Sequence, residues 1–261
     1  MASEPEDPAI TSLRVVSRCS GEAMSCELWE GRKSPTQESV LSQLPFHSKE
    51  RKNCMHGLCP WDSRTCDRAA RFGHLEVLQY ARDNGCGWEA STCSEAALGG
   101  HLEIVRCAHE NGCRMDRFTL RNAASKGHLN IMQYAHEHGC RWCSSTCILA
   151  AQNGNFECLQ YAHENGCPWG KATCYEAAAN GHLECLQYAI ENGCPWDERV
   201  CLEATKKGNF EILKYAYEKN DCPWHKRTYD LAANHGHWKI LKYAIEHGCP
   251  WNEEDVLSRA T

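Results

Sequence analysis

The sequence lacks an excess of positive charge, and it lacks any long apolar run. Its formal net charge is −6 at pH 7, and its isoelectric point is near 6.2. Proteins that bind nucleic acids or anionic membranes normally carry a basic face, so this balance argues against both kinds of partner. No stretch approaches the roughly 18 apolar residues that a membrane-spanning helix needs. We therefore expect neither a nucleic acid nor a membrane as the binding partner.

The chain also lacks the common signatures of catalysis and secretion. It contains no G-x-x-x-x-G-K-[ST] phosphate loop and no distinctive Ser-His-Asp or Cys-His constellation for nucleophilic catalysis. The first residues include Glu4, Glu6, Asp7, Arg14 and Arg18 without a continuous apolar segment, unlike a secretory signal peptide. We expect a protein with no enzymatic activity and no cofactor. Its expected location is intracellular, in the cytoplasm or alternatively in the nucleus.

What the chain does have is internal repetition. Cys-Pro-Trp, or a close variant, recurs at a spacing of 27 residues at every step but one. The step from Cys194 to Cys222 is 28 residues, because residues 219–221 replace an Asn-Gly pair. A fixed period between about 20 and 50 residues is typical of a solenoid. Seven complete units and a half unit then cover residues 59–261. The units open at Cys59, Cys86, Cys113, Cys140, Cys167, Cys194, Cys222 and Cys249.

Each unit predicts a short first helix. In the fifth unit this helix spans residues 173–180, where Cys174, Ala177 and Ala178 share one face at spacing i, i+3, i+4. Gly181 follows, at the position where a left-handed C-cap ends a helix. The apolar face is small, so the first helix is expected to pack closely against its neighbours.

A second helix follows directly, from residue 182 to about residue 192. Leu183, Leu186 and Ala189 lie on its apolar face. The position equivalent to Ala189 is occupied by alanine in all seven units, which indicates a close approach between helices. The Cys-Pro-Trp link shows no strand signal, because proline removes a backbone donor. A helix pair of this size cannot bury its faces alone, so neighbouring units must stack to form the core.

The repeat resembles an ankyrin repeat. Residues 96–105, A-A-L-G-G-H-L-E-I-V, match the family core A-A-x-x-G-H-L-E-I-V almost letter for letter. The departures are T-C-x-x in place of T-P-L-H and a period of 27 instead of about 33 residues. The variant is similar to C-P-W ankyrin-like repeats of giant viruses and some protists. The resemblance implies an all-α, ankyrin-like solenoid of stacked helix-turn-helix repeats, with the β-hairpin reduced to a short Cys-Pro-Trp link. It also implies protein binding without catalysis.

Most of the twenty cysteines are expected to be reduced, and several are expected to be buried as small hydrophobes. Cys158 and Cys185 stand where other units carry valine or isoleucine, and several first-helix cysteines exchange with Leu120 and Tyr229. A cysteine that exchanges with these residues acts as a small hydrophobe. Equivalent cysteines of adjacent units should lie about 8–10 Å apart, set by helix packing. Disulfides between the unit-opening cysteines are therefore not expected, since their Cα atoms would exceed the usual reach.

Two recurring patterns suggest metal binding and have alternative explanations. Histidine follows the cap glycine in five units, but asparagine replaces it at Asn155 and Asn209, so we favour a helix N-cap over a zinc ligand. Cys140, Cys143 and Cys147 form a C-x2-C-x3-C cluster without a second C-x2-C pair. A zinc-binding protein remains an alternative. The recurring histidines are His74, His101, His128, His182 and His237.

A tryptophan stripe follows the links. It could form a ligand surface, but it more often replaces the packing of a lost element, here the hairpin. We favour packing. The stripe comprises Trp61, Trp88, Trp142, Trp169, Trp196, Trp224 and Trp251, with Met115 in the third unit.

The repeats predict three regions. Residues 1–46 are interrupted by four prolines and are expected to form a disordered leader, residues 47–58 an irregular cap, and residues 59–261 the array. The expected function is a non-enzymatic scaffold, monomeric, that binds another protein through a concave surface. A substrate-binding adaptor of a ubiquitin ligase, with the leader recruiting the catalytic machinery, is the alternative.

The binding surface is expected where the copies differ most, at the two residues before each cap glycine. By resemblance to ankyrin proteins, this end of the first helix borders the concave groove. Apolar residues would serve as anchors and lysines as steering charges. The expected contact residues are Arg71, Phe72, Leu98, Lys126, Gln152, Asn180, Lys206, Lys207 and Asn234.

Overall fold

The computed structural model describes residues 63–83, 86–225 and 227–250. Within these ranges every regular element is an α-helix, and fourteen helices form seven consecutive pairs, as the repeat predicts. This confirms the all-α solenoid. In the same ranges, no helix is both long enough and apolar enough to traverse a bilayer. The expected leader, the cap and most of the C-terminal half unit lie outside the described residues.

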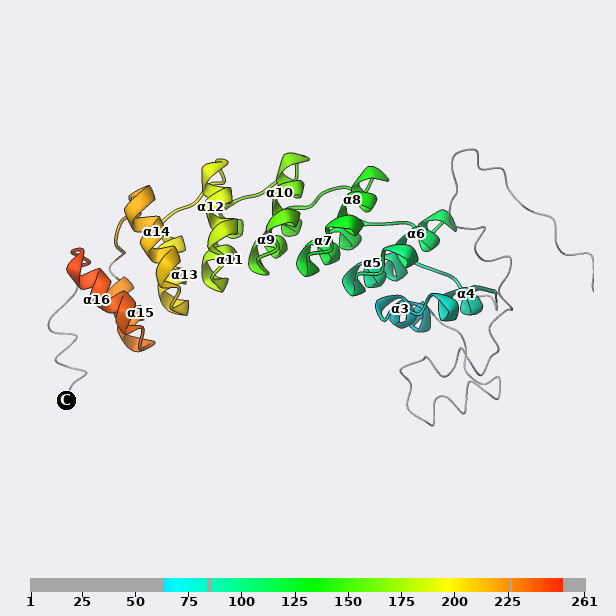
Figure 1. Ribbon diagram of the computed structural model, residues 1–261, viewed down its shortest axis with the longest axis horizontal. Helices are drawn as coiled ribbons and strands as arrows, with labels where there is room; N and C mark the ends of the chain where they lie inside the picture. The colour runs from blue at the N-terminus through cyan, green and yellow to red at the C-terminus, as the bar shows by residue number, and fades with distance from the viewer. Residues whose placement is uncertain (1–62, 84–85, 226, 251–261) are drawn as a thin grey trace, which may run out of the picture. The chain divides into compact units, whose positions relative to one another are not determined.

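The first helices of the units are odd-numbered in Figure 1 and the second helices even-numbered. Each pair fills one unit between two links. The pairs are α3 Ser63–Arg71 and α4 Leu75–Asp83; α5 Ala90–Gly99 and α6 Leu102–Glu110; α7 Arg117–Lys126 and α8 Leu129–Glu137; α9 Ser144–Gln152 and α10 Phe156–Glu164; α11 Lys171–Asn180 and α12 Leu183–Glu191; α13 Arg199–Lys207 and α14 Phe210–Asn220; α15 Thr228–Asn234 and α16 Trp238–Glu246.

The first helices stack side by side along the array. Each first helix from α3 to α13 contacts the first helix of the next unit, and each first helix from α3 to α15 contacts its own second helix. Within this array the first helices lie along the inner side of the bend, and the second helices lie along the outer side (Figure 1). The ends of the first helices are therefore placed on the concave side of the array.

The core of the fifth unit shows why the helices can pack so closely. Cys174, Ala177 and Ala178 on α11 are fully buried, as are Leu186 and Ala189 on α12. Small side chains at the first-helix positions let neighbouring backbones approach, and leucine fills the remaining space. The predicted apolar faces are thus confirmed, with α11 beginning two residues earlier than expected.

The same backbone hydrogen bond recurs at the turn into each link. The N–H of Cys194 donates to the carbonyl of Ala189 at 2.8 Å. In the 28-residue unit, the N–H of Cys222 still donates to the equivalent alanine, Ala216, at 3.1 Å. The extra residue is absorbed by a longer α14 and by Asp221, which adopts a left-handed conformation with φ 49°. The insertion thereby leaves the link in register with the others.

Most described cysteines behave as core residues. Cys158 and Cys185 are almost completely buried on the second-helix face. Burial raises the pKa of the Cys158 thiol to about 12 and that of Cys185 to about 11, so both stay protonated at neutral pH. The prediction that they replace valine and isoleucine as small hydrophobes is confirmed.

The expectation of reduced thiols is wrong at one pair. Cys201 on α13 and Cys222 in the following link are joined by a disulfide. The pair does not join two link cysteines, whose separation the helix packing sets. It joins a first-helix cysteine to the cysteine at the end of its own helix pair, 21 residues later. A comparison of equivalent positions in adjacent units could not reveal this contact.

Candidate protein-binding surface

The expected contact residues lie in what we call the first-helix row, the two positions that precede each cap glycine. Of the nine expected residues, Leu98 and Gln152 are half-buried and the other seven are exposed. Phe72 is 52% exposed, an unusually open position for a phenylalanine side chain. The row comprises Arg71, Phe72, Leu98, Gly99, Ser125, Lys126, Gln152, Asn153, Ala179, Asn180, Lys206, Lys207, Asn234 and His235.

The backbone of this row is held by the histidine or asparagine of the following unit. His182 contacts the carbonyl of Gln152 through Nε2 at 3.0 Å, and Asn209 Nδ2 donates to the carbonyl of Ala178 at 2.7 Å. Because a carbonyl can only accept, Nε2 of His182 carries the proton. Equivalent bonds join His101 to Arg71, His237 to Lys206, and Asn155 to Ala124.

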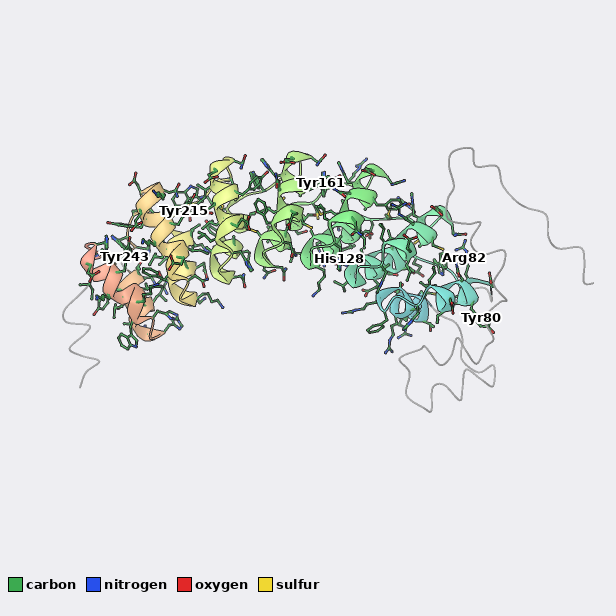
Figure 2. The ribbon with its side chains drawn as sticks, viewed as in Figure 1. Tyr80, Arg82, His128, Tyr161, Tyr215 and Tyr243 are labelled. Carbon is green, nitrogen blue, oxygen red and sulfur yellow. A yellow bond between two sulfur atoms is a disulfide. The ribbon has the colours of Figure 1, made fainter. Side chains whose placement is uncertain are left out.

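The predicted N-cap role of these side chains is therefore corrected. His101, His182 and their equivalents do occupy the N-cap position of the second helix, but their side chains make no hydrogen bond to that helix. They instead satisfy the last carbonyls of the first helix in the preceding unit, which have no partner within their own helix. Histidine and asparagine interchange because both offer an N–H donor. His128, labelled in Figure 2, bonds the backbone of Leu98 in the same way.

The cap glycines leave room for these side chains. Gly154 has φ 71°, a left-handed conformation that a side chain disfavours. A Cβ atom built on Gly154 would lie 2.4 Å from Nδ1 of His182. The glycine is thus required both by its own backbone and by the ring that bonds the neighbouring helix end.

Charge separates the first-helix row from the second helices. The row carries Arg71, Lys126, Lys206 and Lys207 and no carboxylate, although the net charge of the chain is −6. Arg71 also reaches Glu95 of the next unit at 3.6 Å. Five of the seven described second helices, all except α8 and α16, instead carry an acidic residue in the first turn, where negative charge is favourable. These are Glu76, Glu103, Glu157, Glu184 and Glu211.

The comparisons with known proteins agree with this architecture. The family described as "Ankyrin repeats (many copies)" matches residues 174–216. Among solved structures, the human ASB11 ankyrin repeat domain matches with a TM-score of 0.56 at 20% sequence identity. The match covers 68% of this chain and 96% of that domain. None of the curated proteins matches the chain.

These repeats have the ankyrin fold. The stacked helix pairs of the array match the fold of that domain. At 20% identity the likeness extends to the fold alone. It assigns neither a partner nor contact residues to this ankyrin array.

The tryptophan stripe packs against the ankyrin core. Trp169 stacks on His163 with 3.8 Å between ring centroids, and Trp142 lies over His136 at 4.6 Å. His136 on α8 also hydrogen-bonds the hydroxyl of Tyr161 on α10 (Figure 2). The packing explanation is confirmed for those tryptophans of the stripe that the structure describes, which are half-buried against the core. They are Trp88, Trp142, Trp169, Trp196 and Trp224.

The three cysteines of the candidate metal cluster each contact a different group. The thiol of Cys143 contacts Ser145 Oγ at 3.0 Å, while Cys147 hydrogen-bonds Cys167. The third member, Cys140, reaches the carbonyl of Asp116 at 3.7 Å. Across residues 63–83, 86–225 and 227–250, no three His, Cys, Asp or Glu side chains gather in a metal-binding group.

Two exposed aromatic residues, Phe118 and Trp238, were missed by the sequence reasoning, and Trp238 at the start of α16 is 68% exposed. Phe118, at the start of α7, is 39% exposed and lies under the guanidinium groups of Arg117 and Arg121. Other units carry serine, alanine or arginine at this position. The same comparison between copies that identified Phe72 could have identified Phe118. Its place at the opposite end of a first helix makes it a matched control for the row.

Proposed function

We propose that this ankyrin array is a non-enzymatic scaffold that binds another protein through the first-helix row. The observation that carries the proposal is the composition of the row, which has four basic residues and no carboxylate on an acidic chain. Exposed Phe72 adds an apolar contact at one end. The matching partner is a protein surface with carboxylates and a site for an aromatic ring, because complementary charge steers association and buried aromatic residues dominate affinity.

The backbone geometry supports the same surface. The bonds from His101, His182 and His237 fix the carbonyl groups of row residues in the preceding unit. A row whose backbone is already held in place loses little conformational entropy when a partner binds, and such preorganisation favours affinity. The side chains, by contrast, differ from unit to unit and can encode specificity.

The proposal is tested with the partner captured by the full chain. Phe72→Ala should weaken binding by about 1 kcal/mol or more, roughly fivefold in Kd, with the melting temperature nearly unchanged. Phe118→Ala is the control and should leave the affinity within about twofold. Calorimetric titration of both variants measures the effect. Equal loss from the two variants, or no loss from Phe72→Ala, would remove the row from the interface.

Charge is tested separately within the same experiment. Lys206→Glu with Lys207→Glu should slow association, and the slowing should shrink as salt is raised, because exposed charges act mainly on the association rate. Lys239→Glu with Lys242→Glu, which reverses the charge of two exposed lysines on α16 outside the row, is the matched control. If both changes slow association equally, the effect comes from the overall charge of the chain, and the row is not a specific binding surface.

The adaptor of a ubiquitin ligase remains the second proposal for the chain. It places the recruiting segment within residues 1–58, outside the described residues. Affinity capture with residues 1–58 alone, compared with the full chain, distinguishes the two. Capture of ligase components by residues 1–58 would support the adaptor proposal. If no ligase component is captured, the adaptor proposal is rejected and only the scaffold proposal stands.

A further inference from the structure

Cysteine pairs recur within the helix pairs. In the first unit, Sγ of Cys66 lies 2.9 Å from Sγ of Cys86, and in the second unit Cys93 lies 3.1 Å from Cys113. Each pair joins the first helix to the link that follows its own second helix. Two further units hold the same thiol contact, and the sixth unit holds it as the disulfide already described. These are Cys147 with Cys167, Cys174 with Cys194, and Cys201 with Cys222.

One of these pairs borders a cavity. A cavity of about 300 Å³ is lined by Cys113, Met115, His109 and His138, with exposed Arg114 at its rim. Met115 stands where the other described links carry tryptophan. In the next two units, that tryptophan stacks on the histidine equivalent to His109. The smaller methionine leaves this volume unfilled, and Cys113 lines it.

The two thiols of this pair differ in burial and in charge. Cys93 is fully buried, whereas Cys113 keeps 5% of its surface exposed. The hydrogen bond that Cys93 donates lowers the pKa of Cys113, and the same contact raises the pKa of Cys93. Burial and Asp67 oppose the Cys113 thiolate, and Arg82 favours it. Sγ of Cys113 lies 2.8 Å from the carbonyl oxygen of Glu89. Cys113 is thus the nucleophile of the pair, and Cys93 is the thiol that retains its proton.

We propose that Cys93 and Cys113 form a dithiol that reacts with small hydroperoxides, which reach it through the cavity. The Cys113 thiolate attacks one oxygen of hydrogen peroxide, the O–O bond breaks, and Cys113 becomes a sulfenic acid. The released hydroxide takes up a proton to give water. Cys93 loses its proton and attacks the Cys113 sulfur, the S–O bond breaks, and a second water leaves. Two thiols and one peroxide become one disulfide and two waters, with the thiols oxidised and the peroxide reduced.

The consequence is a covalent closure of the second unit. The new bond would join the start of α5 to the first residue of the link after α6, across 20 residues. The sixth unit already holds this connection through Cys201 and Cys222. The fold therefore accommodates a disulfide between these two positions of the repeat.

The test follows disulfide formation at two sites in one sample. The full chain is reduced, freed of reductant and exposed to hydrogen peroxide, then quenched with N-ethylmaleimide at intervals and analysed by peptide mass spectrometry. Cys174 with Cys194 is the internal reference, because Trp196 occupies the position of Met115 in that unit. The pKa of Cys194 is lowered by its partner thiol just as that of Cys113 is, so the two pairs differ in access to the cavity. The Cys93–Cys113 disulfide should therefore form about tenfold faster than the Cys174–Cys194 disulfide. Equal rates would overturn the proposal.

Two variants test separately the access of peroxide to the thiol pair and the roles of the two thiols in the reaction. Met115→Trp restores the residue of the other links and should slow oxidation of Cys93–Cys113 about fivefold or more, without changing the reference pair. An unchanged rate in folded Met115→Trp would contradict the role of the cavity, and Met115→Phe serves if the larger ring prevents folding. Cys93→Ser removes the resolving thiol, so a sulfenic acid should persist at Cys113 and be trapped by dimedone. A dimedone adduct at Cys107 instead of Cys113 would overturn the assignment of the nucleophile.

Discussion

Gly154→Ala should lower the free energy of unfolding by about 2–5 kcal/mol, a large loss for a single added methyl group. About 1–2 kcal/mol comes from placing a Cβ in the left-handed conformation. A further cost of about 1–3 kcal/mol comes from overpacking. The overpacking arises because the new Cβ would lie 2.4 Å from Nδ1 of His182. Urea unfolding followed by circular dichroism measures the loss.

Gly166→Ala is the matched control for this change. Gly166 has φ 80°, close to that of Gly154, but a Cβ there meets no atom within 4 Å. Its replacement should cost only about 1–2 kcal/mol. Combining Gly154→Ala with His182→Ala should give less than the sum of the two single losses, because the ring that causes the clash is gone. Equal losses from the two glycine variants would show that His182 does not restrict position 154.

Ala189→Leu should cost about 1–3 kcal/mol through overpacking of the helix interface. Ala189 is fully buried on α12, and the equivalent position is alanine in every unit. The larger side chain has no free volume to enter, so α12 must shift from its neighbours. Glu191→Leu, an exposed position on the same helix, should change stability by less than about 0.5 kcal/mol. A melting temperature unaffected by Ala189→Leu would mean that the helices do not approach at this point.

The sequence was sufficient for the fold because its information is periodic. The recurring cap glycine marks the end of each first helix, and the recurring alanine marks the buried face of each second helix. Both features act within one unit, so they can be located from spacing alone. The extra residue before Cys222 could also be located, although its accommodation by Asp221 in a left-handed conformation could not.

The predictions from the sequence were wrong where a side chain contacts another unit or a different position of its own unit. His182 looked like an N-cap because it precedes a helix, but its ring reaches Gln152, 30 residues earlier. Cys201 and Cys222 are also far apart in sequence and occupy different positions of the repeat. Periodicity compares equivalent positions, so it gives no information about contacts between positions that differ.

The candidate surface was predicted from variability, and variability does not determine exposure. Phe72 is exposed, as its proposed role as an anchor requires, whereas Leu98 is half-buried beside it in the row. The neighbouring Gly99 explains the difference in environment, because a Cβ at that position would lie 2.1 Å from the carbonyl of Arg71. The first helices of these two units therefore approach closely at their ends. Such an approach depends on the packing of two units and cannot be deduced from one.

Site-specific photo-crosslinking tests the central claim most directly. A benzophenone amino acid is placed at Phe72 or Lys126 in the first-helix row, or at Glu103 or Glu184 on the second helices, and the full chain is irradiated in cells. The scaffold proposal predicts that one protein is crosslinked from both row positions and from neither second-helix position. Crosslinks from Glu103 and Glu184, with none from Phe72 and Lys126, would contradict it.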